Sequence, residues 1–474
     1  MQRFRRTTLI LVGCLSALAG IGLARKVSFV YSDYLLLFLP ALLLIKKKNL
    51  ASLIIVITLG LLVGLWRGGL YMQKLGDLKA LTLRPVTIQA VASSDAVYAS
   101  GSQLQFTASQ VQLIEPHHQN LAGNFKLSGF GVKMVYRGDV VRVSGKLYPT
   151  RGANQATIGY AQLSVIAQSH SWFNDLSRKF STGMQNALPE PLASFGMGLL
   201  IGQRINMPAL VTAELTAVGL VHIVAVSGYN LTILIRAIQR FRLRSKYQQL
   251  IASLALIGVF VTITGFSASI VRAALVSSLS LWAWYYGRKI RPIVLISFAA
   301  ALTGMLNPFY IWGDLSWYLS FLAFFGVMII APVIQARFFK RTPKFLTIVL
   351  LETLSAELMT LPIIMMTFSQ LSLIAIVANL LVVPLVPWAM LLAAVGGTAG
   401  AVIPQLAGWL AWPANLLLTY MLDVIHLMAA IPSVLVHASI NATYMIIFYA
   451  ILLAVVLTAH KKSKDKKLQT SLIK

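Results

Sequence analysis

The chain has 474 residues, of which 58% are hydrophobic and only 11% are charged, and its mean hydropathy is +0.77. This composition excludes an ordinary soluble globular protein, so most of the chain is expected to lie in lipid. A formal net charge of +27 indicates a polyanion-binding surface, positively charged cytoplasmic loops, or both. The single cysteine, Cys14, excludes a disulfide framework and a cysteine-based metal site.

Three apolar runs open the chain, at residues 7–24, 34–45 and 49–66. The first run also fits a signal peptide, but two further runs follow it directly, which favours a retained helix. Basic residues precede the first run (RFRR) and the third (KKK), so both sites are expected in the cytoplasm and the third span should end outside. Residues 1–70 are therefore predicted to be N-terminal transmembrane helices.

Residues 71–170 have a different pattern, in which short apolar runs alternate with polar residues, as in Leu104, Phe106 and Ala108. A turn at Gly138-Asp139 separates two strand-like stretches. The pattern predicts an extracytoplasmic β-rich domain of the OB type, a small five-stranded barrel, inserted after the third helix. A β-sandwich gives the same pattern.

Residues 171–190 are predicted to form an amphipathic interfacial helix, because apolar residues recur at helical spacing around Arg178 and Lys179 and Pro189 ends the pattern. From 191 to 460 the chain is almost continuously apolar, and pairs of apolar runs separate its basic clusters. All these clusters can face the cytoplasm, together with a basic tail at 461–474. The chain is thus predicted to be a polytopic α-helical membrane protein with about ten to twelve transmembrane helices.

Motifs of common enzymes are absent from the sequence. It contains no GxxxxGK[ST] phosphate loop, no HEXXH metal motif and no GxSxG nucleophile elbow. We therefore expect no enzymatic activity, no metal and no cofactor.

Polar side chains inside the predicted spans are the main functional signal, because an ionisable group at the centre of a span costs about 2.5–3.5 kcal/mol. The segment HIVAVSGYNL at 222–231 is typical of a broken helix that lines an aqueous path. The alternative is structural pairing inside the helix bundle. The candidate path residues are His222, Ser227, Gly228, Asn230, Arg272, Asp314, Ser320, Glu352, Glu357 and Asn379.

Glu352 and Glu357 are unlike a catalytic dyad. They are five residues apart, so they diverge by about 140° on a helix. One of them can instead pair with a basic group such as Arg272.

Basic residues in the β-rich domain alternate with the aromatic residues Phe130 and Tyr136. This combination suits a surface that follows a phosphate backbone while bases stack on the rings. An ordinary basic surface is the alternative. The candidate DNA-binding residues are Lys126, Lys133, Arg137, Arg142 and Lys146.

The stretch GMGLLIGQRINMPALVTAELTAVGLVHIVAVSGYNLTILI, which begins at Gly196, resembles the signature of the ComEC competence family. Three further motifs follow in the family's order, at 265–275, 307–326 and 361–386. The three opening spans and the external domain also resemble the family, so the similarity covers nearly the whole chain. Asn230 departs from the His or Gln that is common in the family.

The resemblance implies a channel for uptake of single-stranded DNA across the bacterial cytoplasmic (inner) membrane during natural competence. It also implies an outer DNA receptor and a cytoplasmic helicase-like ATPase as partners. Many relatives carry a C-terminal metallo-β-lactamase-like domain, and its His/Asp motif is missing from this sequence up to Lys474. A separate nuclease is therefore expected to degrade the other strand.

Two other functions remain open from the residues. A secondary transporter of a small solute could use Glu352, Glu357 or Asp423 as a proton or ion relay. A family member could also serve only as a structural partner of another uptake component.

Overall fold

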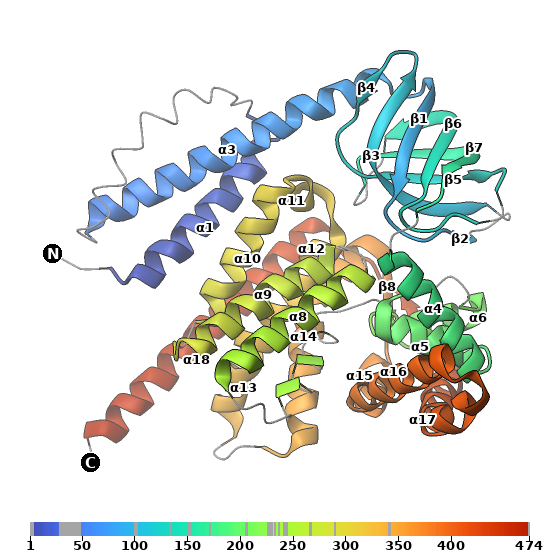
Figure 1. Ribbon diagram of the computed structural model, residues 1–474. Coiled ribbons are helices and arrows are strands. Elements are labelled where there is room, and N and C mark those ends of the chain that lie inside the picture. The colour runs from blue at the N-terminus through green and yellow to red at the C-terminus, as the bar shows by residue number, and fades with distance from the viewer. Residues whose placement is uncertain are drawn as a thin grey trace. The chain divides into compact units, whose positions relative to one another are not determined.

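The structure is a computed structural model that describes most of the chain (Figure 1). The described residues are 4–27, 49–98, 103–132, 134–149, 154–169, 172–203, 207–224, 231, 234–235, 238–239, 245–264, 268–288, 291–339 and 343–472. The chain forms two compact units. The first unit comprises Met1–Ser181, Gln203–Asn206 and Leu231–Tyr318, and the second comprises Thr182–Gly202, Met207–Asn230 and Leu319–Lys474.

Long apolar helices confirm the prediction of membrane spans. Within the described residues, six helical segments are long and apolar enough to cross a bilayer: Arg6–Leu23, Leu50–Gly76, Leu315–Phe338, Thr347–Phe368, Ala375–Val402 and Pro404–Ala429. Four shorter apolar helices lie at Leu192–Ile201, Lys246–Thr262, Pro292–Leu306 and Ala442–Val456.

In the first unit, helices α1 (Arg6–Leu23) and α3 (Leu50–Ala80) pack through small residues. A Cβ atom added to Gly64 of α3 would lie 2.2 Å from the Ala17 carbonyl oxygen, and one added to Gly20 would lie 2.2 Å from the Leu61 carbonyl oxygen. Only glycine permits this close backbone approach, which is how membrane helices associate without a hydrophobic driving force.

Replacing Gly64 with leucine is expected to lower the melting temperature of the purified protein in detergent, because overpacking a close contact costs about 1–3 kcal/mol. Gly76→Leu on the same helix is the control, since a Cβ atom there meets nothing within 4 Å. Equal melting temperatures for the two variants would show that the α1–α3 contact does not stabilise the protein.

The other helices described in the first unit are short or of medium length. They include α8 (Lys246–Thr264), α9 (Ala268–Tyr285), α10 (Pro292–Leu306) and α11 (Phe309–Gly313), together with the starts of α4 (Trp172–Ala187) and of α12 (Leu315–Phe325). Pro292 occupies the first helical position of α10, where its missing N–H costs no hydrogen bond.

A closed β-sheet follows α3, which confirms the predicted β-rich region. Its long strands are β1 (Pro85–Ala92), β3 (Leu104–Glu115), β5 (Phe125–Phe130), β6 (Val140–Pro149) and β7 (Ala156–Ala167), with short β2 (Val97–Tyr98) and β4 (Gln119–Asn120) at β3. The long strands pair in the order β1-β3-β5-β7-β6, and β6 pairs with β1 to close the ring. Of these strand pairs, β5 with β7 is parallel and the others are antiparallel.

Alternation of buried and exposed residues builds the core of this barrel. Ile88, Phe125, Val143 and Ile158 point inward and are fully buried. Because successive side chains of a strand point to opposite faces, each strand leaves a second set of residues on the outer surface.

Helix α3 continues beyond the predicted boundary at residue 70 and reaches the barrel (Figure 1). Leu75, Leu78 and Leu81 pack against the barrel core. The side-chain amide of Gln155 in turn donates a 2.8 Å hydrogen bond to the Tyr71 hydroxyl of α3. The helix therefore extends past residue 70 because its last turns have an apolar surface to cover.

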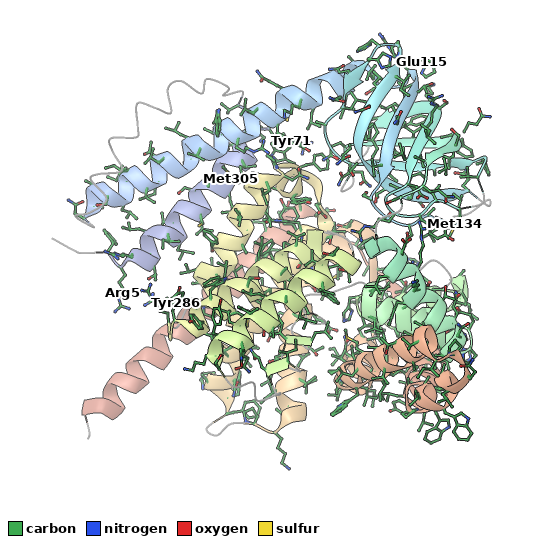
Figure 2. The ribbon with its side chains drawn as sticks, in the orientation of Figure 1. Arg5, Tyr71, Glu115, Met134, Tyr286 and Met305 are labelled. Carbon is green, nitrogen blue, oxygen red and sulfur yellow. The ribbon has the colours of Figure 1, made fainter. Side chains whose placement is uncertain are left out.

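Arg67 ties α3 to the C-terminus of α10. Its Nε donates to the Met305 carbonyl at 2.8 Å, and its Nη2 donates to the Leu306 carbonyl at 2.9 Å. A cation at the last carbonyls of a helix is favourable. The Tyr71 ring lies beside this contact, with its centroid 5.9 Å from the Arg67 guanidinium carbon. Figure 2 labels Met305 and Tyr71.

Asp139, in the predicted turn, organises the side of the barrel beside helix α4 (Trp172–Ala187). Its carboxylate accepts hydrogen bonds from the backbone N–H groups of Tyr136 at 2.8 Å and Ser169 at 3.0 Å. Arg178 of α4 lies 3.8 Å from the same carboxylate and over the Tyr136 ring. Only the stretch after this turn forms a strand; the stretch before it, at 134–136, does not.

Where the structure describes it, the second unit is helical apart from one two-stranded sheet, β8 (Gln370–Ser372) with β9 (Leu435–His437), which was not predicted. Its described helices include the ends of α4 and α12, and α5 (Leu192–Ile201), α6 (Ala209–Ala217), α13 (Ala331–Phe338), α14 (Phe345–Phe368), α15 (Ala375–Val382), α16 (Val386–Val402), α17 (Pro404–Ala429) and α18 (Ala442–Leu472). A π-helical segment at Gly326–Ile330 joins α12 to α13, and a 3-10 turn at Val383–Leu385 joins α15 to α16.

Candidate functional site

The outer surface of strands β5, β7 and β6 carries basic and aromatic side chains on neighbouring positions. Lys126 of β5 lies opposite Thr157 of β7, which lies opposite Tyr148 of β6. One row further, Lys146 of β6 lies opposite Gly159, next to Tyr160. We call the exposed set Lys126, Phe130, Arg142, Lys146, Tyr148 and Tyr160 the barrel face.

The composition of the barrel face favours an anionic, ring-containing ligand. Strands β5, β6 and β7 contain no acidic residue. Phe130, Tyr148 and Tyr160 are 45%, 40% and 82% exposed, although rings of this size are usually more buried. Cations that can contact phosphates and rings that can stack on bases therefore share one surface.

A bulge in β7 turns Tyr160 outward. Tyr160 has a φ of +52°, and the pairing register with both β5 and β6 shifts at this point. Gly129 and Gly145 on the flanking strands allow the close approach, since a Cβ atom on Gly129 would lie 2.0 Å from the Ala161 carbonyl oxygen. A left-handed conformation costs a tyrosine roughly 1–3 kcal/mol, and such strain is concentrated at functional sites.

The predicted DNA-binding residues do not all belong to this surface. Lys126, Arg142 and Lys146 are exposed on the barrel face, whereas Lys133 lies outside the described residues. Arg137 points elsewhere: its Nη1 donates to the Thr262 carbonyl of α8 at 3.0 Å. Burial lowers the pKa of the Arg137 guanidinium, and the nearby Asp95 carboxylate opposes that shift.

Sequence reasoning missed Tyr148 and Tyr160. Tyr148 is two residues after Lys146 in β6, so strand alternation places both on one face and could have identified it. Tyr160 breaks the alternation of β7, and no local signal in the sequence predicts the bulge.

Two predicted path residues of the first unit lie in one buried cluster. Arg272 of α9 and Asp314 are each 2% exposed and interact electrostatically. Arg272 Nη2 donates to the Ser316 carbonyl at 2.8 Å, and the Asp314 carboxylate accepts from the Trp317 backbone N–H at 3.2 Å. The cluster compensates two buried charges.

Two predicted path residues of the second unit are also paired. Asn379 of α15 donates a 2.7 Å hydrogen bond from Nδ2 to Glu357 Oε1 of α14. Asn379 is 2% exposed, and Glu357 and Glu352 on the same helix are partly buried. Glu352 and Glu357 therefore lie on one helix, and the hydrogen-bond partner of Glu357 is Asn379.

The other predicted path residues are separate from these pairs or cannot be placed. Ser320 is partly buried on α12, and the ring of His222 lies 3.1 Å from the Gly219 carbonyl oxygen. Ser227, Gly228 and Asn230 lie outside the described residues. Asp423 of α17 is exposed, and His426 near it pairs with Glu214 of α6 at 2.7 Å.

These features define a multi-pass membrane protein with a β-barrel domain. It has apolar helices of membrane-spanning length, a closed barrel between them in the sequence, and buried charges that are paired. The model of the competence protein family matches residues 199–462, which is more than half of the sequence. The chain belongs to the competence protein family, as the motifs between Gly196 and residue 386 predicted.

A curated relative supports the same assignment. ComE operon protein 3 of Bacillus subtilis (strain 168) is 26% identical over 288 residues, which cover 60% of this chain. The aligned part is 34% of that relative, so the chain spans only about a third of its length. The comparison with solved structures gave no match.

Proposed function

We propose that this protein conducts single-stranded DNA across the bacterial cytoplasmic (inner) membrane during natural competence and has no enzymatic activity of its own. The observation that carries the proposal is the barrel face, in a chain of the competence protein family. Cations follow a phosphate backbone and exposed rings stack on successive bases without sequence preference, which suits an import protein.

The barrel is proposed to be an OB-type domain. Counting only its five long strands, the pairing order is first, second, third, fifth, fourth and back to the first. A five-stranded Greek-key barrel of this kind is a common binder of oligonucleotides.

The barrel is proposed to lie outside the cytoplasm. The charge rule predicts that α3, α8 and α10 end on the outer side, because basic residues precede each of them. All three ends lie on the barrel side of the first unit. The end of α3 packs against the barrel core, the Thr262 carbonyl of α8 accepts from Arg137, and the Leu306 carbonyl of α10 accepts from Arg67 of α3. These contacts support the topology without a further assumption.

The route through the helices is proposed to pass residues whose charges are compensated, such as Arg272 with Asp314. Uncompensated cations would hold a phosphate backbone too tightly, and conduction requires weak binding at each point. The chain has no nucleotide-binding motif, so we propose that a cytoplasmic helicase-like ATPase pulls the strand. An outer DNA receptor and a separate nuclease complete the proposed partners.

The test is uptake of labelled DNA by cells in which this gene is deleted and then restored. The expected result is loss of internalised, nuclease-resistant DNA while surface-bound DNA is retained, with recovery on restoration. Unchanged internalisation in the deletion strain would reject the DNA channel and favour the transporter of a small solute.

A further inference from the structure

The pair formed by Glu357 and Asn379 has an unused hydrogen-bonding atom. Asn379 gives one N–H to the Glu357 carboxylate, but its Oδ1 is buried and has no hydrogen-bond partner within the described part of the chain. Buried amide oxygens are normally satisfied. The site therefore lacks a donor in the arrangement shown.

Protonation of Glu357 would supply that donor. An ionised carboxylate only accepts hydrogen bonds, so it faces the amide NH₂, as in the structure. A protonated carboxyl has an O–H to donate, and the Asn379 amide can turn over to accept it through Oδ1. An asparagine thus fits both protonation states, whereas a lysine or arginine in its place would fit only the ionised state.

Among the described residues, no lysine or arginine forms an ion pair with Glu357. Helices α14, α15, α16 and α17 contain no lysine or arginine. The titratable groups on α14 and on the elements packed against α14 or α15 include exposed Arg337 at the end of α13, Glu352 of α14, Tyr420, Asp423 and His426 of α17, and Tyr444 and Tyr449 of α18. Tyr449 donates to the Met359 carbonyl at 2.7 Å, and His426 is paired with Glu214.

We propose that Glu357, with Asn379 as its amide partner, is a proton-binding site within the membrane-spanning part of the second unit. Glu357 takes up a proton and the Asn379 amide reorients to accept its hydrogen bond. This site does not depend on the barrel face or on the identity of the transported molecule.

The test is labelling of the full-length protein in lipid nanodiscs with dicyclohexylcarbodiimide, which reacts with protonated carboxyl groups. Modified residues are located by mass spectrometry across about pH 5 to 9, a range that brackets most shifted carboxyl groups. We expect Glu357 to be labelled and its labelling to fall as the pH rises. Asp423, which is exposed on α17, serves as an internal reference.

Two variants test the role of the amide. Asn379→Leu removes the N–H that stabilises the ionised carboxylate, so the labelling midpoint of Glu357 should move up by about one pH unit or more. Asn415→Leu is the matched control, because Asn415 lies on α17 and accepts a local 3.3 Å hydrogen bond from the Thr419 hydroxyl. It should leave the midpoint unchanged.

Three outcomes would overturn the proposal: no labelling of Glu357 at any pH while Asp423 reacts, labelling of Glu357 that does not vary with pH, or protection of Glu357 by Na⁺ at constant pH, which would assign a sodium site instead. The wild-type titration decides the matter even if Asn379→Leu fails to fold. An unchanged midpoint in a folded Asn379→Leu protein would remove Asn379 from the site.

Discussion

Replacing Arg272 with methionine is expected to lower the free energy of unfolding by about 3–5 kcal/mol, because it leaves the buried Asp314 carboxylate without its cation. Arg272 and Asp314 are each 2% exposed, so solvent screens their interaction poorly. The measurement is unfolding in mixed micelles with increasing denaturing detergent. Arg288→Met, an exposed arginine just after α9, is the control and should change stability by less than about 0.5 kcal/mol.

The double variant Arg272→Met/Asp314→Asn separates a structural role from a role in transport. Removing both charges is expected to restore much of the stability, because no uncompensated charge remains. If Arg272 only stabilises the bundle, DNA internalisation should recover with stability. A stable double variant that still fails to internalise DNA would show that Arg272 contacts the moving strand. A double variant no more stable than Arg272→Met would contradict the proposed pairing.

Tyr160→Ala on the barrel face is expected to weaken binding of single-stranded DNA to the full-length protein by about 1–3 kcal/mol, roughly 5- to 150-fold, because one stacking surface is lost. Fluorescence anisotropy with a labelled oligothymidine measures the affinity. Tyr286→Ala is the matched control, since Tyr286 is also exposed, at 64%, but lies just after α9, away from the barrel (Figure 2). Equal loss in both variants would contradict a stacking role for Tyr160.

Neutralising Lys126 and Lys146 together tests the phosphate contacts of the same face. The slope of log affinity against log salt should become less steep by about 1.4, because each phosphate contact to a single strand contributes about 0.7. Arg25→Gln/Lys26→Gln changes the net charge by the same amount at exposed positions after α1 and should leave the slope unchanged. A slope that is the same in both double variants would show that Lys126 and Lys146 do not contact the strand.

The sequence predicted the parts of the fold that depend on local periodicity. Apolar runs give the spans, and alternation in residues such as Leu104 and Phe106 gives the strands, since burial of one face imposes a period of two. It did not show that α3 continues to Ala80, because the reason is a long-range contact of Leu75 and Leu78 with the barrel core.

For the candidate sites, the sequence indicated charged residues but not the groups that they contact. Lys126, Arg142 and Lys146 were predicted as basic residues on or near strands, and all three are exposed. Arg137 was predicted in the same way, but its hydrogen bond to Thr262 joins residues far apart in the sequence. The same holds for Glu357, which was considered with Glu352 and Arg272, whereas its contact is the neutral Asn379. Which polar group faces which across a bundle depends on helix packing, and no periodicity within one helix encodes it.

The unbroken course of α3 also has a mechanical consequence. A barrel joined to a span by a flexible linker could turn freely, but this barrel packs on the last turns of a continuous helix that contacts α1 through glycines and α10 through Arg67. Tension on a polymer held by the barrel would load α3 along its length and reach the lipid-embedded helices of the first unit directly. A stiff connection of this kind would transmit force with little loss, so tension on a polymer bound to the barrel would act on these helices as well.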